Sequence, residues 1–166
     1  MVRAPAWEVA ARVVDPELRV VTVAELGILR AVDTDGDRAV VTITPTYAGC
    51  PAMDVIRADL AAALRGAGWS DVEVVTRLRP AWSSDQITDS GRAKLAAAGI
   101  APPPGAGPGG HRCRLPLLAP AAAAAIPCPQ CASVRTEEVS RFGSTACTSL
   151  WRCQACGEPF GHVKAI

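Results

Sequence analysis

Hydrophobic and polar positions repeat with different periods along the first hundred residues, and together they predict a mixed fold. Residues 6–14 carry apolar side chains at helical spacing. We expect this short helix to end at Asp15, because a residue before proline disfavours the helical region. Residues 28–32 and 38–44 are predicted strands. Asp35-Gly36 between them is typical of a hairpin, since the central residues of a tight primed turn need positive φ.

A second helix is predicted over residues 51–65, ending at the glycines of 66–68. A third strand follows over 72–78, and a final helix with its body over 92–98 and Thr88 as its cap. The order helix-strand-strand-helix-strand-helix predicts an α+β class, a small sandwich with helices on a mostly antiparallel sheet. The second helix has one apolar face at steps of three and four, formed by Met53, Ile56, Leu60 and Leu64.

Residues 101–126 differ from what precedes them. They hold six prolines, four glycines and a run of alanines, a composition typical of a partly extended linker. His111 and Cys113 lie inside this stretch, and we expect no ligand role for either. The chain therefore divides into a domain at 1–100, a linker at 101–126 and a second module at 127–166.

The second module carries two C-x-x-C motifs, Cys128 to Cys131 and Cys153 to Cys156, separated by 21 residues. This spacing predicts a zinc ribbon with strands over 136–142 and 147–152, and Cys147 is predicted to lie in the second of them. Four cysteines leave no open coordination position, so the site is expected to be structural, with zinc or iron as its metal. About 40 residues bury little surface, and the metal supplies the missing stability.

Composition narrows the classes of function. The chain has 166 residues, 49% of them hydrophobic, and a net charge of +1, which argues against a broad nucleic-acid surface. No apolar run suits a membrane helix, and the N-terminus lacks a signal core. We expect a cytoplasmic protein without nucleic-acid or membrane partners. Seven cysteines in such a protein indicate metal or redox ligands before disulfides.

Cys50 is the candidate for chemistry in the first domain. Pro51 suits a first helical residue, which makes Cys50 a candidate N-cap whose thiol meets the positive end of the helix, favouring thiolate. The alternative is a small buried hydrophobe. Asp15 has a simpler expected role, capping the turn that follows it.

Several motifs resemble the SufT-type iron–sulfur assembly factors. Asp15-Pro16-Glu17-Leu18 and residues 22–28 resemble the opening motif of that family, and residues 44–51 resemble its cysteine loop. Residues 80–82, 91–95 and 99–103 extend the match, although Gln86 stands where an aromatic residue is expected, which would alter one wall of the site. Together with the ribbon, they make the chain similar to the family of D subunits of the phenylacetyl-CoA epoxidase system.

The resemblance implies an accessory protein of aerobic phenylacetate catabolism rather than the oxygenase or another enzyme. It would assist iron–sulfur cluster assembly or delivery to the reductase component, with Cys50 as a transient iron or cluster ligand and Asp15 and Glu17 beside it. One cysteine cannot complete a four-thiolate shell, so a homodimer, a partner ligand or iron alone is expected.

Two other functions remain. The chain is alternatively a structural subunit of the oxygenase with a zinc-stapled docking module, or an enzyme with Cys50 as nucleophile. The last is the weakest, since both histidines lie outside the first domain.

Overall fold

The computed structural model describes residues 4–47, 49–104 and 126–164. The chain divides between Lys94 and Leu95 into two compact units. This division falls before the predicted boundary at residue 100. The reason is a short strand, β4 (Ile100–Ala101), which pairs with a strand of the second unit and so takes the end of the predicted first domain into the other sheet.

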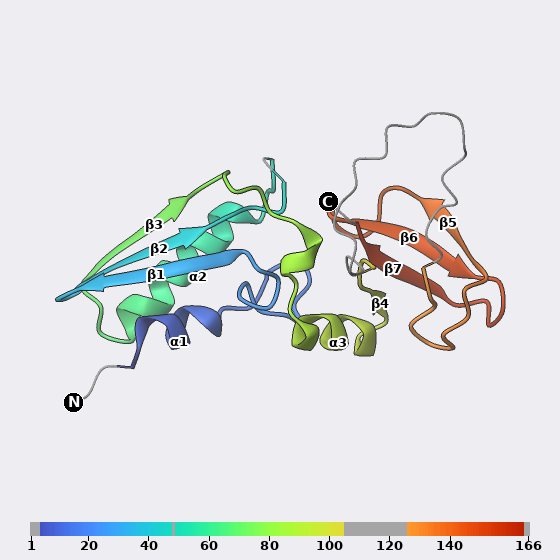
Figure 1. Cartoon of the computed structure of the whole chain (residues 1–166), viewed down its shortest axis with the longest axis horizontal. Helices are drawn as coiled ribbons and strands as arrows, with labels where there is room; N and C mark the ends of the chain where they lie inside the picture. The colour runs from blue at the N-terminus through green and yellow to red at the C-terminus, as the bar shows by residue number, and fades with distance from the viewer. Residues whose placement is uncertain (1–3, 48, 105–125, 165–166) are drawn as a thin grey trace. The chain divides into compact units, whose positions relative to one another are not determined.

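The first unit contains a three-stranded sheet in the order β1 (Leu29–Asp35), β2 (Arg38–Ile43), β3 (Asp71–Thr76). Helices α1 (Ala6–Ala11) and α2 (Met53–Gly66) lie side by side on one face of it (Figure 1). β1 and β2 are antiparallel, but β3 runs parallel to β2 because α2 forms a crossover between them. The sheet is therefore mixed, where a mostly antiparallel one was predicted.

The hairpin between β1 and β2 forms where it was predicted, with a turn shifted by one residue. Asp35 pairs with Arg38, so the two loop residues are Gly36 and Asp37 rather than Asp35 and Gly36. Gly36 has φ +55°, and Asp37 is not among the described residues with positive φ. A turn with glycine at the first central position meets this requirement with one residue.

The core of the first unit lies between β2 and the helices. Ala39, Val41 and Ile43 alternate along β2 and are completely buried. The predicted apolar face of α2 is buried too, which confirms the helical periodicity. Each large aliphatic side chain buried in this way stabilises the fold by about 1.5–3 kcal/mol relative to an exposed one. The buried face of α2 consists of Met53, Ile56, Leu60 and Leu64.

The loop between α1 and β1 has little regular structure and is fixed by a capping box. The Oγ1 of Thr22 accepts from the Glu25 N–H at 3.2 Å, and the Glu25 carboxylate accepts from the Thr22 N–H at 3.0 Å. The same carboxylate accepts from the Ser90 hydroxyl at 2.8 Å and pairs with Lys94 at 2.7 Å. Glu25 thus joins the loop to α3 (Asp89–Ala97).

Two glycines allow the close approach between these segments. A Cβ on Gly91 would lie 2.9 Å from the Glu25 carbonyl oxygen, and one on Gly27 would lie 2.6 Å from the Gln86 Cβ. Gln86 ends the short 3-10 helix η1 (Ser84–Gln86). The indole N–H of buried Trp82 donates to the Leu26 carbonyl at 2.8 Å, so residues 22–28 are held from several points. We refer to this set of contacts as the Glu25 clamp.

The predicted cap of the last helix is confirmed, although the helix begins earlier than expected. The Thr88 hydroxyl accepts from the Gly91 N–H at 3.0 Å, and α3 starts at Asp89 rather than near Arg92.

The second unit is a four-stranded sheet in the order β4, β7 (Pro159–Val163), β6 (Thr148–Cys153), β5 (Thr136–Ser140). Cys147 was predicted in a strand; it lies instead in the turn before β6, where its carbonyl accepts from the Lys164 N–H. A small core packs behind the cysteine motifs and is extended by half-buried Trp151. It consists of Ala101, Ile126, Cys128, Cys153 and Phe160.

Among the described residues, no helix has the length and apolar character needed to cross a bilayer. His111 and Cys113 lie outside the described residues.

The Glu25 clamp predicts a pH-dependent stability. Burial raises the pKa of Glu25, but the hydrogen bonds from Lys94, Thr22 and Ser90 together outweigh burial. They lower the pKa from an ordinary 4.5 to about 2. The ionised carboxylate therefore stabilises the fold fully above pH 4.5, and this contribution disappears as the pH falls toward 2. We expect Glu25→Gln to lower the free energy of unfolding by about 1 kcal/mol or more at pH 7, measured by urea unfolding.

The matched control is Asp54→Asn, which removes an exposed carboxylate paired with Arg57 on α2. Exposed pairs contribute little, so this variant should unfold like the parent. A Glu25→Gln cost that persists unchanged at about pH 2.5 would contradict the assignment of the stabilisation to the charged carboxylate.

Candidate functional site

The four cysteines of the second unit converge on one point. Their Sγ atoms all lie within 4.8 Å of one another, with 3.8 Å between Cys128 and Cys156 and 3.6 Å between Cys131 and Cys153. A tetrahedral ion with Zn–S bonds of about 2.3 Å requires sulfurs about 3.8 Å apart. The sulfur set therefore has the geometry of a four-thiolate zinc site.

The two C-x-x-C motifs have the same backbone geometry. In the first, the Cys128 N–H donates to Ser133 O and the Ala132 N–H donates to Cys128 O. In the second, the Cys153 N–H donates to Glu158 O and the Gly157 N–H donates to Cys153 O. Each turn needs a residue with positive φ four positions after its first cysteine. Gly157 meets this at +79°, whereas Ala132 holds +57° against its steric preference.

The pKa values of the cysteine thiols also indicate that this site binds a cation. A hydrogen bond from the Cys156 backbone contributes most to lowering the pKa of Cys153, to about 6. The Glu158 N–H lowers the pKa of Cys156, but burial and the neighbouring sulfurs raise it to about 12. Four thiolates this close cannot all ionise at neutral pH unless a positive ion compensates their charge. A bound zinc ion would supply that charge and tie the two motifs together.

Cys50 lies in the loop between β2 and α2. It was predicted as the N-cap of the helix, and this is wrong: α2 begins at Met53, its N-cap is Ala52, and Cys50 and Pro51 belong to a preceding turn. The Cys50 N–H donates to Tyr47 O and its carbonyl accepts from the Met53 N–H, so the chain makes a separate turn before the helix. The thiol is half-buried.

The expected thiolate character of Cys50 is also wrong for the protein by itself. Burial raises the pKa of the thiol above its ordinary value. The Ala52 N–H lowers the pKa, the negative charges of Glu17 and Asp15 raise it, and a hydrogen bond with the Thr46 side chain lowers it. Burial and the two carboxylates prevail, because they disfavour a negative sulfur.

These electrostatic effects place the three predicted residues in one neighbourhood, because the charges of Glu17 and Asp15 act directly on the Cys50 thiol. Asp15 is buried, and its Oδ1 accepts from the N–H groups of Glu17 and Leu18 at 3.0 and 2.7 Å. The expected capping of this turn by Asp15 is therefore present. The hydrogen bond from the Glu17 N–H to Asp15 also fixes the position of Glu17 on this loop. Further along the loop, residues 22–28 are held by the Glu25 clamp.

Sequence reasoning missed Thr46 as a partner of the thiol. Its position four residues before Cys50, in the segment Thr44-Pro45-Thr46, was the available signal. Gln86, which stands where the family resemblance leads us to expect an aromatic residue, lies against Gly27 in the clamp. Its side-chain Oε1 is buried and has no hydrogen-bond partner among the described residues.

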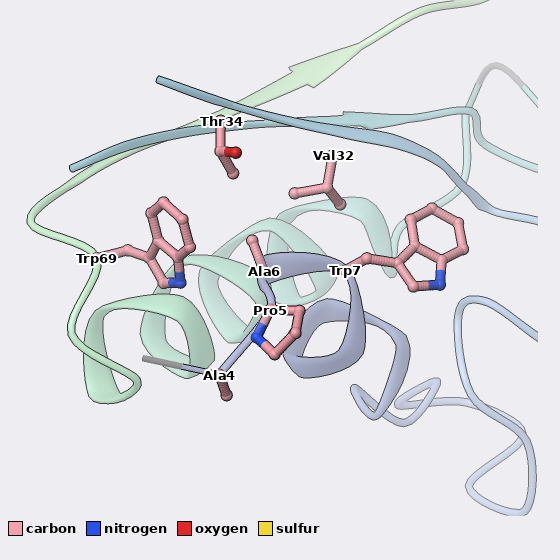
Figure 2. A pocket seen from close by; sticks show the side chains of 7 residues that line it. All are labelled: Ala4, Pro5, Ala6, Trp7, Val32, Thr34 and Trp69. Atoms are coloured by element: carbon pink, nitrogen blue, oxygen red, sulfur yellow. The ribbon is translucent and has the colours of Figure 1, made fainter. Parts of the chain in front are cut away.

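A hollow of about 420 Å³ opens elsewhere on the first unit, between α1 and β1 (Figure 2). Trp7 and Trp69 lie on opposite sides of it, with Ala6 and Pro5 between them and Val32 and Thr34 above. It contains none of the predicted site residues, and the described residues that line it offer no carboxylate, thiol or imidazole. Its chemistry is that of apolar packing.

Comparison with known proteins identifies both parts of the chain. Residues 6–76 match a family described as iron-sulfur cluster assembly protein, and residues 117–164 match one described as PaaD zinc beta ribbon domain. A protein of Escherichia coli (strain K12), provisionally named as the D subunit of 1,2-phenylacetyl-CoA epoxidase, is 40% identical over 160 residues, which are 96% of this chain and 91% of the relative.

Two solved structures match the first part. The crystal structure of a domain of unknown function, DUF59, from Bacillus anthracis has a TM-score of 0.50 at 29% identity, covering 54% of this chain and 87% of that one. A solution structure from Mycobacterium tuberculosis is titled as a protein associated with Fe-S complex assembly and repair. It is 39% identical over 57% of this chain and 88% of that one, with a TM-score of 0.36.

The two cysteine turns give a paired prediction. Ala132→Gly removes the steric cost of a left-handed alanine, and we expect the metal-bound ribbon to gain about 1 kcal/mol. Gly157→Ala introduces the same cost at a position where a Cβ meets no atom within 4 Å, so an equal loss is expected without any clash. Zinc release to a coloured chelator measures both, and equal release rates in the two variants would contradict the interpretation.

A further prediction concerns the charge of Glu17, which acts on the Cys50 thiol. Glu17→Gln removes a charge that raises the pKa of the thiol, so a larger fraction is thiolate at a mildly alkaline pH. We expect alkylation of the Cys50 peptide by iodoacetamide, followed by mass spectrometry, to accelerate roughly two- to tenfold. Glu8→Gln on α1 is the control with the same change in net charge. An unchanged rate in Glu17→Gln would show that Glu17 does not act on the thiol.

Proposed function

This chain belongs to the family of D subunits of phenylacetyl-CoA epoxidase, and from that membership we propose that it is a non-catalytic, cytoplasmic accessory protein of the epoxidase system. Its first unit assists the assembly or delivery of iron–sulfur clusters, and Cys50 is the residue that holds the cargo. The recipient is the iron–sulfur reductase component. Support comes from the match of residues 6–76 to an iron–sulfur cluster assembly family.

The observation that carries this proposal is the grouping of Cys50 with Glu17, Asp15 and Thr46. Two carboxylates that disfavour a negative sulfur attract a positive ion to the same place. An iron ion would reverse the effect of burial, since it replaces the thiol proton and compensates the carboxylates. The site thus keeps its thiol protonated when empty and releases a proton on loading, which suits transient binding.

One thiolate leaves the coordination shell of the cargo incomplete. Asp15 already uses Oδ1 to accept two backbone N–H groups, so the arrangement favours Glu17 as the second ligand from this chain. Further ligands come from the recipient or from a second copy of the chain. Such sharing is a route for transfer, because a recipient that adds ligands can take over the ion or cluster.

The zinc ribbon supplies no chemistry to this transfer. Cys128, Cys131, Cys153 and Cys156 would hold a zinc ion, which stabilises a unit with a small core. A folded ribbon then presents a fixed surface to other components of the epoxidase.

A second function, that of a structural subunit without iron, is favoured by one observation. The Cys50 thiol is half-buried and its pKa is raised, as for a cysteine that serves only packing. The two functions differ in whether iron depends on Cys50.

Metal and sulfide analysis of anaerobically purified full-length protein separates them. We expect the parent to bind iron, or iron and sulfide, and Cys50→Ser to lose at least about nine-tenths of it while zinc stays the same, because the thiolate is the main soft ligand for iron. Cys147→Ser is the matched control, since it removes a half-buried cysteine that lies outside the four-sulfur set.

Iron that is absent from the parent, or present equally in Cys50→Ser, would overturn the carrier function. Epoxidase activity reconstituted with each variant completes the test. Activity should fall with Cys50→Ser while the complex still forms. A structural subunit would instead keep its activity as long as the chain folds.

A further inference from the structure

The second unit has a hollow of its own, of about 450 Å³, away from the four sulfurs. Trp151 and Ser149 of β6 and His162 of β7 line it, and Ser149 and His162 face each other in the register of the two strands. Phe142 and Arg141 come from the segment after β5. Lys164 and Glu138 complete the lining, and we call this feature the Trp151 hollow.

Hydrogen bonds assign the protonation of His162. The Trp151 indole N–H donates to the Ser149 hydroxyl at 2.9 Å. That hydroxyl lies 3.4 Å from Nδ1 of His162, and its own hydrogen is directed to this nitrogen if the imidazole is neutral. Burial lowers the pKa of His162 to about 4, so the ring is neutral near pH 7. The proton therefore resides on Nε2.

This leaves one buried donor on His162, a residue that lines the hollow. The Nε2 atom is buried and has no hydrogen-bond partner among the described residues. His162 is only 7% exposed, so water does not replace the missing partner freely. A buried donor without an acceptor destabilises the folded unit. A ligand oxygen, from either a carboxylate or a carbonyl, would accept from this donor once the side chains that cover Nε2 move aside.

The rim of the hollow adds apolar surface and positive charge. Phe142 is 79% exposed, and the Lys164 ammonium lies 5.5 Å from the centre of its ring. The ammonium also donates to Ala146 O at 2.9 Å, which holds it in place. Arg141 is the second cation, and Glu138 is the one carboxylate that the described residues contribute to the lining. Exposed aromatic residues with arginine are typical of the energetic centre of a protein interface.

We propose that the Trp151 hollow docks a segment of a partner protein in which a carboxylate side chain stands next to an aromatic or large aliphatic one. The apolar side chain packs on Trp151 and Phe142. The carboxylate lies between Arg141 and Lys164, within reach of the donor on His162. This inference rests on the proposed function only for the identity of the partner, which is a component of the epoxidase.

Charge complementarity selects this occupant. Among the lining residues that the structure describes, two cations outnumber one carboxylate, so a basic segment would be repelled. Nucleic acid would need several phosphate contacts along a basic surface, whereas this hollow offers two cations beside Glu138. An apolar segment without a carboxylate would leave the His162 donor unpaired.

Photo-crosslinking tests the docking on the full-length protein. Phe142 is replaced with p-benzoylphenylalanine, and the zinc-loaded chain is irradiated with the other purified components of phenylacetyl-CoA epoxidase. We expect a cross-link to one component, whose cross-linked peptide, identified by mass spectrometry, contains an acidic residue beside an aromatic or aliphatic one. The control carries the same photoreactive residue at Val134, which is 62% exposed and does not line the hollow.

Charge-reversal variants give a quantitative test, in which the affinity for that component is measured. Arg141→Glu with Lys164→Glu should weaken binding to that component at least about tenfold, because like charges then face each other. Arg135→Glu with Arg152→Glu makes the same change in net charge at two exposed arginines outside the lining, and should bind like the parent. Equal zinc content in all variants shows that the ribbon is folded.

Three outcomes would overturn the inference: a cross-link no stronger than that from Val134, a cross-link only between two copies of this chain, or unchanged affinity after charge reversal. The Cys50→Ser variant distinguishes a failure of the docking inference from a failure of the proposed carrier function. If it still docks but binds no iron, the docking stands and the carrier function depends on Cys50. If docking fails while iron still depends on Cys50, the carrier function stands alone.

Discussion

The loop that carries Asp15 and Glu17 is tied to α3 by one carboxylate, that of Glu25. It accepts hydrogen bonds from segments far apart in the sequence, from Thr22 on one side and from Ser90 and Lys94 on the other. Residues 15–28 belong to neither helix nor strand; backbone hydrogen bonds such as that from the Asp15 N–H to Val21 O hold the loop locally, and Glu25 ties it to α3. The same loop carries Asp15 and Glu17, whose charges act on the Cys50 thiol.

The two units are stabilised in different ways. The first has a core large enough to fold around β2 and α2, and it adds the clamp to fix an irregular loop. The second has only a small core and relies on four sulfurs, whose metal ties together two turns far apart in sequence. In both units, the candidate residues are fixed by hydrogen bonds within the unit, such as those of Asp15 to the Glu17 and Leu18 N–H groups and of Ser149 to Trp151. Rigid support of this kind is what a transient site requires, since it must bind without rearranging.

Periodic features were predicted well. The buried face of α2, the hairpin and the cap at Thr88 follow from side-chain spacing and turn chemistry, which are local. The predictions that failed involve partners distant in sequence or the exact start of an element. Cys50 was assigned to the helix start because Pro51 suits a first turn, yet the chain makes a separate turn before Met53. The parallel pairing of β3 and the strand β4 depend on which edges meet in space.

By itself, the sequence predicted the α+β class, the four-cysteine cluster and the candidate thiol Cys50, because these follow from periodicity and motif, whereas Asp15 and Glu17 became candidates only through the family resemblance. The tertiary structure alone decided the state of the thiol. Its pKa is set by burial and by charges contributed from a loop much earlier in the chain, and neither is encoded in the residues next to it. The same holds for the donor on His162: the pairing of β6 with β7 places His162 opposite Ser149, and its Nε2 has no hydrogen-bond partner among the described residues.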